Sequence, residues 1–338
     1  MKSKRFGCME GIGCTDLAGR LLTLESVKPV CLTGISGEPI NIMMNKLHCE
    51  TKTVKQHQYA NRWPDFSRQW HLLGSPLRPV AQDISFCEDA VLEWNRLHGA
   101  PKVLILGVTP EIYHLPWPER TDIIAADSKQ DMINNVWPGP KDAVLLTDWL
   151  DLDLPDASRD IVLCDGGLHL LSYPDEQVRL VNLLNRIISD DGLLIIRLYT
   201  PPPKQESPDA ILEDLLAGRI SNINIMKLRV GMSIMENSEK GVQLRNIWNT
   251  VNRVAPDLNN LAANLGWPLE QTLVFNAYKE SAIRYCFVTI DQVLDMACRK
   301  PGGFEIRSVR IPSYELGNQC PTLVLKRIPR HQPQEITI

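Results

Sequence analysis

The sequence predicts an α/β fold with a doubly wound parallel sheet, and three observations support this class. Five short, continuous apolar runs follow one another along the chain, as the buried strands of a parallel sheet do. Helical patterns separate several of these runs, and such alternation is typical of a doubly wound sheet. The chain has 338 residues, of which 44% are hydrophobic, so it can build a substantial core in one large domain or two ordinary ones.

Residues 1–62 are predicted to form an N-terminal extension or linker outside that sheet. Short β-like pieces at Arg20–Leu24 and Val30–Thr33 are punctuated by glycine and proline, which predicts a small β-hairpin. The polar stretch 50–62 indicates a linker or an exposed helix. Because β-like segments can pair between subunits, the extension could also be the oligomer arm of a homodimer.

A helical pattern covers residues 63–100, and the segment PLRP (76–79) divides it into two pieces. The second piece, Asp83–Leu97, has apolar residues at helical intervals and is followed by the stop signals Gly99 and Pro101. The period then changes, and five buried strands are expected at Lys102–Leu106, Ile123–Ala126, Ala143–Leu146, Asp160–Cys164 and Leu193–Leu198.

Helices dominate the second half of the predicted fold. Apolar residues share one face of the expected helix Asp175–Ile188. From about 205 to 280 the chain is predicted to be mostly helical, with interruptions at Pro256 and Pro268. It then ends with one helix and two strands, at Thr289–Arg299, Phe304–Arg310 and Thr322–Arg327. The mostly helical stretch is therefore an insertion before the last two strands.

Charge and hydropathy argue against several classes of protein. Lys plus Arg number 36 and Asp plus Glu number 40, which gives a net charge of −4. This balance argues against a nucleic-acid partner and against binding to an anionic membrane. No apolar run approaches about 18 residues, so no transmembrane span is expected. The first residues lack the apolar core of a signal peptide, so a cytoplasmic location is expected.

The nine cysteines indicate neither a disulfide framework nor a metal site. Their number is odd, and no CxxC pair occurs. His48, Cys49 and His57 lie near one another in the sequence, but their spacing fits no zinc pattern well. We therefore expect reduced thiols and no bound metal.

Acidic residues follow three of the predicted strands at the point where each strand ends. Asp127 follows the second strand, Asp148 the third and Asp165 the fourth. Since ligands of doubly wound sheets bind beyond the carboxyl ends of the strands, these carboxylates are expected at one edge of the sheet. Asp127 lies about 20 residues after Gly107, a spacing at which an acid can accept hydrogen bonds from ribose hydroxyls. Each acid alone would be an ordinary cap or loop residue, whereas three together indicate a ligand site.

The segments around these strand ends carry a resemblance to a known family. VLILGVTPE is similar to the first motif of the class I S-adenosylmethionine-dependent methyltransferases, and IIAADSKQDMI is similar to the second. TDWLDLDLPDASRDIVLCDGGLHLL resembles the next two motifs, and ISDDGLLIIRLY resembles the fifth-strand signature. The final strands, GFEIRSVRIP and PTLVLKRI, suit the antiparallel ending of that fold. Residues 102–200 carry the close resemblance.

The resemblance implies a doubly wound, seven-stranded, mostly parallel sheet with an antiparallel last strand. The sequence pattern adds an N-terminal extension and a helical insertion before the last two strands. The methyltransferase domain would span residues 63–338. Its parts would be a helical lid, a cofactor-binding core, a helical insertion on the substrate side and the final strands, at 63–100, 101–204, 205–300 and 301–330.

The same resemblance implies S-adenosyl-L-methionine as the cofactor and S-adenosyl-L-homocysteine as the product. Asp127 would bind the ribose hydroxyls, with Ser128 beside it and Met132 packed near the adenine. Asp148 would accept from the adenine amino group, next to a wall formed by Trp149. The remaining cofactor contacts would come from Gly107, Val108, Thr109, Asp165, Gly166 and, through the cofactor carboxylate, Arg78.

The first motif departs from the family pattern in one respect. The family usually has two or three glycines there, whereas LGVTPE has only Gly107. This departure argues more strongly against a dinucleotide, whose pyrophosphate needs the pattern G-x-G-x-x-G at a helix N-terminus.

Acceptor-side residues are predicted after the fourth and fifth strands and in the upstream segment. His169 is the candidate general base, because its usual pKa is near 6.5; the alternative is a histidine that packs in the core. Arg197 and Tyr199 could bind a polar or acidic substrate, although Arg197 could equally pair with a nearby carboxylate. Trp70 could lie over the substrate or belong to the core.

Three functions follow from these residues. The leading one is a methyltransferase that acts on O, N or S of a small-molecule acceptor. The segment DGGLHL stands where RNA amine methyltransferases often have N/D-PP-Y, which argues against a nucleobase amine. The alternatives are a methyltransferase for a peptide or carrier-bound acceptor, and a non-catalytic regulatory protein that binds S-adenosylmethionine.

Overall fold

The computed structural model of the chain describes residues 67–298 and 303–329. All of them belong to one unit, His57–Ile338. The expected extension over residues 1–62, with its hairpin, lies outside the described residues, and so do His48, Cys49 and His57.

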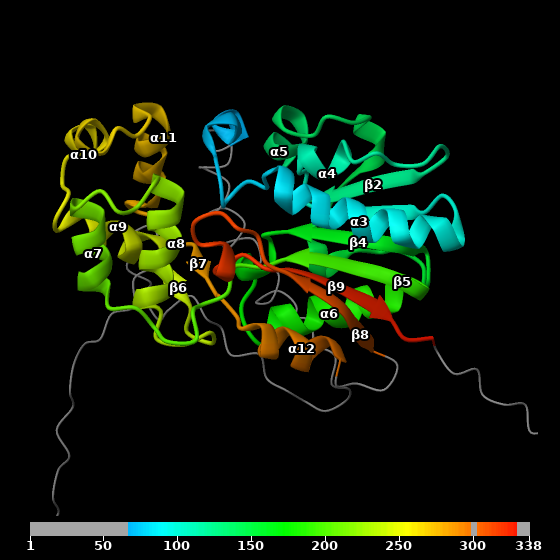
Figure 1. Cartoon of the computed structure of the whole chain (residues 1–338). Helices are drawn as coiled ribbons and strands as arrows, with labels where there is room; N and C mark the ends of the chain where they lie inside the picture. The colour runs from blue at the N-terminus through cyan, green and yellow to red at the C-terminus, as the bar shows by residue number, and fades with distance from the viewer. Residues whose placement is uncertain (1–66, 299–302, 330–338) are drawn as a thin grey trace, which may run out of the picture. The chain divides into compact units, whose positions relative to one another are not determined.

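Seven strands form one sheet in the order β3-β2-β1-β4-β5-β9-β8 (Figure 1). Their bounds are β1 Lys102–Leu106, β2 Asp122–Asp127, β3 Val144–Leu146, β4 Arg159–Asp165, β5 Ile188–Arg197, β8 Phe304–Arg310 and β9 Thr322–Arg327. The first five strands pair in parallel, whereas β9 lies between β5 and β8 and is antiparallel to both. The sheet predicted from the sequence, with its antiparallel last strand, is confirmed.

Helices cover both faces of this sheet (Figure 1). One face packs against α3 Ala81–His98, α4 Pro110–Tyr113 and α5 Gln130–Asn135, and the other against α6 Asp175–Ile187 and α12 Ile290–Cys298. In β1, Val103 and Ile105 point to the first face, while Leu104 and Leu106 point to the second. Because both faces are buried, the strand is apolar throughout and shows no alternation with polar residues.

The predicted helical insertion is also present. Its helices are α7 Pro208–Leu216, α8 Ile223–Ile234, α9 Leu244–Asn252, α10 Leu258–Leu265 and α11 Leu269–Leu273. A two-stranded antiparallel sheet, β6 Val242–Gln243 with β7 Arg284–Tyr285, was not predicted. The apolar faces of these helices form a core of their own, which also includes Tyr199 from the segment after β5.

Short 3₁₀ helices complete the described elements. They are η2 Trp70–Leu72, η3 Lys141–Ala143, η4 Trp149–Asp151, η5 Leu168–Leu170, η6 Val274–Tyr278 and η7 Gly317–Gln319. The helical pattern expected over 63–100 is interrupted more widely than PLRP alone implies, because residues 73–80 form turns and extended backbone between η2 and α3. Two prolines, Pro76 and Pro79, deprive this segment of backbone donors that a helix would need.

The start of α8 gives a testable prediction of stability. Asn222 is the N-cap residue, and its side-chain oxygen accepts from the amides of Asn224 and Ile225 at 2.9 and 3.0 Å. We expect Asn222→Ala to lower the free energy of unfolding by about 1 kcal/mol, since both amides lose their acceptor. Urea unfolding measures the change. Asn222→Ser is the control; a loss as large as that of alanine would contradict the capping explanation.

Candidate functional site

The loop after β1 approaches the end of β2. Gly107 N donates to Ala126 O at 2.8 Å, and Gly107 has a φ of +93°, a conformation that favours glycine. Val108 and Thr109 are buried behind it. Thr109 occupies the N-cap position of α4 as expected, although its side chain makes no capping hydrogen bond. The loop thus presents a glycine backbone at the carboxyl edge of the sheet.

Asp127 ends β2 beside this loop. Its Oδ1 accepts from Lys129 N at 2.8 Å, and the side chain is partly buried. Burial raises the pKa of Asp127 to about 6, because the carboxylate loses solvation that one amide only partly replaces. Ser128, next to it, is exposed. Asp127 is therefore an under-solvated acceptor at the strand end.

The segment after β3 places a cap and an indole at the same edge. Asp148 is exposed and accepts from Leu150 N at 2.9 Å as the N-cap of η4. Trp149 Nε1 donates to Ala126 O at 2.8 Å, so the indole lies across the ends of β1 and β2. A Cβ placed on Gly107 would lie 3.7 Å from the Trp149 ring. Trp149 therefore forms a wall beside the Gly107 loop.

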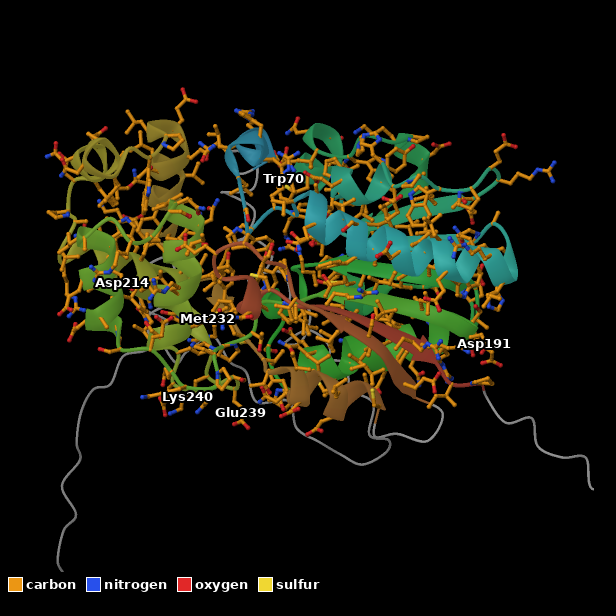
Figure 2. The ribbon with its side chains drawn as sticks, in the orientation of Figure 1. Trp70, Asp191, Asp214, Met232, Glu239 and Lys240 are labelled. Atoms are coloured by element: carbon orange, nitrogen blue, oxygen red, sulfur yellow. The ribbon has the colours of Figure 1, made fainter. Side chains whose placement is uncertain are left out.

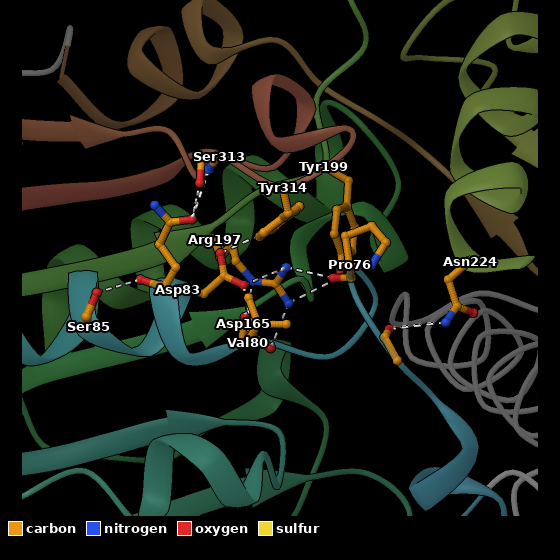
Figure 3. Close-up of polar contacts among 12 residues, drawn as sticks. Pro76, Val80, Asp83, Ser85, Asp165, Arg197, Tyr199, Asn224, Ser313 and Tyr314 are labelled. Carbon is orange, nitrogen blue, oxygen red and sulfur yellow. Dashed lines mark hydrogen bonds and ion pairs between the residues drawn. The ribbon is translucent and has the colours of Figure 1, made fainter. Parts of the chain in front are cut away.

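The end of β4 holds a buried ion pair (Figure 3). Arg197, at the end of β5, is 2% exposed. It donates two hydrogen bonds to Asp165, from Nε to Oδ1 and from Nη2 to Oδ2, the second at 3.1 Å. Arg197 Nη1 also donates to Pro76 O at 2.7 Å. The alternative role considered for Arg197, pairing with a carboxylate, is the one the structure shows. Substrate contact by Arg197 and cofactor contact by Asp165 stay predictions.

The ion pair extends into a network that the sequence did not indicate. Asp83, in the first turn of α3, lies 3.9 Å from Arg197 Nη1 and accepts from Tyr314 OH at 3.0 Å. Burial is the main cause that raises the pKa of Asp83 above its usual value. Tyr199 OH donates to Pro76 O at 2.9 Å, so the 73–80 segment is held against the sheet edge by two side chains (Figure 3).

His169, in η5, lies in an aromatic cluster instead of an open cleft. Its ring centroid is 5.0 Å from that of Tyr199 and 4.4 Å from that of Tyr285, and it stacks on Phe287. Burial lowers the pKa of His169 to about 3, so the imidazole is neutral at physiological pH. His169 Nδ1 has no hydrogen-bond partner among the described residues. His169 can therefore accept a hydrogen bond, and its role as a base stays a prediction.

Gly166 separates the ion pair from this cluster. Its φ is +57°, and an added Cβ would come within 2.7 Å of Tyr199 OH. Tyr199 is buried, and burial raises its pKa well above 10, so its hydroxyl stays protonated. The side chains of Asp165, Arg197, Tyr199 and His169 are thus brought together at one end of the sheet.

Three other predicted residues are engaged in other contacts. Arg78 forms an ion pair with Glu111 of α4, so the cofactor carboxylate would have to compete with that partner. Trp70, labelled in Figure 2, packs against the core on the α3 face, which is the alternative considered for it. Met132 is buried in the same core.

The sequence did not single out Lys227 of α8. Lys227 is 2% exposed, and its Nζ lies 5.4 Å from the centroid of the Tyr278 ring. Tyr278 and Tyr285 share a hydrogen bond of 3.2 Å between their hydroxyls, and Tyr285 contacts His169. A charged residue within a predicted helix ordinarily indicates a solvated face, so only the packing reveals this lysine.

The described residues provide neither a metal-binding cluster nor a membrane-spanning helix. No group of three or more His, Cys, Asp or Glu side chains in residues 67–298 and 303–329 is placed to hold a metal ion. None of the described helices combines the length and the apolar character that crossing a membrane requires.

Comparison with known proteins finds likeness at the level of structure only. No family model and no curated protein matches the sequence. A structure from Rhodobacter sphaeroides, provisionally named a Zn-dependent alcohol dehydrogenase, is similar with a TM-score of 0.51 and 13% identity, over 80% of this chain and 98% of that one. The 1,6-didemethyltoxoflavin-N1-methyltransferase of Burkholderia thailandensis has a TM-score of 0.43 and 10% identity, over 83% and 90% of the two chains. The N-methyltransferase NodS of Bradyrhizobium japonicum has a TM-score of 0.38 and 10% identity, over 80% and 97%.

The strand order carries the assignment of the fold. A parallel sheet ordered β3-β2-β1-β4-β5, followed by an antiparallel β9 inserted before β8, is the arrangement that the sequence resemblance implied. The described part of this chain therefore has the class I, Rossmann-like methyltransferase fold.

Proposed function

We propose that this protein is a methyltransferase that uses S-adenosyl-L-methionine to methylate O, N or S of a small-molecule acceptor. The observation that carries the proposal is Asp127, a partly buried carboxylate at the end of β2 with one oxygen engaged by a backbone amide. The raised pKa of Asp127 indicates a carboxylate that receives too few hydrogen bonds, and two ribose hydroxyls would supply the missing donors. Two structures with similar folds are named as methyltransferases and described with bound S-adenosylhomocysteine.

The residues at the carboxyl edge fit this cofactor. Gly107 offers backbone without a side chain, and the Trp149 indole forms an apolar wall near it. Asp148 is exposed at the end of β3, where it can accept from an amino group. When bound, S-adenosylmethionine supplies an electrophilic methyl group. Asp127, Gly107, Asp148 and Trp149 would hold it.

The chain's own contribution to the reaction is mainly positioning. Methyl transfer by displacement depends on how the two reactants are held, and this term can supply several kcal/mol. Arg197 neutralises Asp165, so the end of β4 carries a paired charge. Neutral His169, with a free Nδ1 among the described residues, would accept a hydrogen bond from the acceptor. Because its pKa is low, His169 would orient the acceptor more than remove its proton.

Titration calorimetry with S-adenosylhomocysteine tests the proposal. We expect micromolar binding to the wild type and a loss of at least about tenfold in Asp127→Ala, since hydrogen bonds to a charged acceptor contribute about 1.5–3 kcal/mol each. Asp122→Ala is the matched control, because Asp122 stands at the opposite end of the same strand. Absence of binding by folded wild type, or equal binding by Asp127→Ala, would contradict the proposal. Binding without turnover over a wide panel of acceptors would favour the regulatory alternative.

The pKa of Asp127 gives this binding a pH dependence. The ionised carboxylate accepts from both hydroxyls, whereas protonation near pH 6 converts it into a poorer acceptor. We therefore expect the affinity for S-adenosylhomocysteine to fall as the pH drops from 7 through 6 to 5. Calorimetry at each pH measures the trend. In Asp127→Asn the residual affinity should stay flat over this range, and a parallel decline in that variant would assign the effect to another group.

A further inference from the structure

Lys227 is a buried lysine without a counter-ion in the described part of the chain. It is 2% exposed, and neither a hydrogen bond nor an ion pair joins its Nζ to any described residue. Burial alone lowers its pKa, to about 7, with no contribution from a neighbouring charge. Burying an ammonium in this way is costly, and buried charges are normally paired.

Other shielded cations in the same region do have partners. Arg197 pairs with Asp165. Arg229, only two residues after Lys227 on α8, pairs with Glu206 and with Asp214, which is labelled in Figure 2. The contrast indicates that the partner of Lys227 is not a part of the described fold, and that a ligand would supply it.

The surroundings of Lys227 connect it to the candidate acceptor region. Its Nζ lies 5.4 Å from the centroid of the Tyr278 ring, and the Tyr278 hydroxyl bonds to that of Tyr285. The Tyr285 ring contacts His169, and His169 contacts Tyr199 just after β5. A series of contacting aromatic side chains therefore connects Lys227 to the sheet edge.

The start of α8 is also fixed to that edge. Asn224, one turn before Lys227, donates from Nδ2 to Gly74 O at 3.1 Å. The same segment is held by Arg197 and Tyr199 through Pro76 O (Figure 3). The position of Lys227 is thus coupled to the groups at the ends of β4 and β5.

We propose that the methyl acceptor is an organic acid whose carboxylate pairs with the Lys227 ammonium, while its remaining part contacts the Tyr278, Tyr285 and His169 side chains. This inference rests on the proposed methyltransferase function. A single carboxylate matches the single positive charge of one ammonium, whereas a phosphate dianion would leave a negative charge unpaired at this buried site. The aromatic neighbours favour a ring-bearing acid over a purely aliphatic one.

The test uses benzoate as the probe and benzamide as its neutral match, on the full chain. Nuclear magnetic resonance of ¹³C-lysine-labelled protein reports the pKa of Lys227. We expect benzoate to raise that pKa, because the carboxylate stabilises the ammonium, and benzamide to leave it unchanged. In calorimetry, Lys227→Met should weaken benzoate binding at least about tenfold. Lys227→Arg keeps the charge and should retain binding, and Ser233→Ala is a control at another buried polar residue of α8.

Three results would overturn the inference. They are no benzoate binding by wild type at millimolar concentration, equal binding of benzoate and benzamide, and unchanged benzoate binding by Lys227→Met. S-adenosylhomocysteine binding separates this inference from the proposed function, since Lys227→Met should bind that compound as the wild type does. Wild type that binds benzoate through Lys227 but does not bind S-adenosylhomocysteine would contradict the methyltransferase function and leave an organic-acid site.

Discussion

Arg197→Met is expected to lower the free energy of unfolding by about 3–5 kcal/mol, the range for removing one partner of a buried ion pair. The variant leaves Asp165 buried without its two guanidinium bonds. It also removes the donor to Pro76 O, which fixes the 73–80 segment. Urea unfolding followed by circular dichroism at pH 7 measures the loss.

A double variant separates the ion pair from simple loss of packing. Replacing both partners, with Arg197→Met and Asp165→Leu together, removes the unpaired charge, so the double variant should be more stable than Arg197→Met alone. Arg197→Lys keeps the charge but loses the bidentate hydrogen bonding. Its free energy of unfolding should lie between those of the wild type and Arg197→Met. If the single variant loses less than about 1 kcal/mol, the network does not hold this edge as described.

Lys227→Met is expected to raise the free energy of unfolding, whereas Arg197→Met lowers it. A fall in the pKa of Lys227 from 10.5 to about 7 corresponds to a cost on the order of 4 kcal/mol at pH 7. Methionine fills a similar volume without an ammonium, so the variant should unfold at higher urea concentration than the wild type.

The same group gives that difference a defined pH dependence. The unfolded chain keeps the lysine proton up to about pH 10.5, whereas the folded chain releases it near pH 7. Between these values the unfolded state binds more protons, so wild-type stability should rise with pH relative to Lys227→Met. Below pH 7 the advantage of the variant should be largest and constant. Tyr278, which faces Lys227, stays neutral there because burial raises its pKa well above 10. An advantage that does not change between pH 7 and 10 would rule out lysine titration as its cause.

Local sequence predicts the sheet well for a physical reason. A strand buried on both faces must be apolar throughout, so β1 is visible as KVLIL and ends at the glycine that follows. β5 begins at Ile188, five residues before the predicted start, because Ile188 pairs with Arg159 ahead of an irregular step in the ladder. β6 and β7 have two residues each, too few to show any period.

The residues of the candidate site likewise divide into those that local sequence predicts and those that it does not. Asp127 and Asp148 are predictable because each lies at or just after the end of a strand that is visible in the sequence. The bond from Arg197 to Pro76 joins residues 121 positions apart, and no local pattern encodes such a contact. Lys227 could not be predicted for another reason. A charged residue in a helix suggests a solvent-exposed position, whereas α8 is buried on nearly every side.

The place of β9 in the sheet has a consequence for how the chain is made. β5 can pair with β4 once both strands have been synthesised, but its other edge has no partner until Thr322–Arg327, which follow the whole helical insertion. During that interval a nascent chain exposes an unpaired apolar edge, the kind of surface that promotes aggregation and chaperone binding. A premature stop codon anywhere in the insertion would make that exposure permanent.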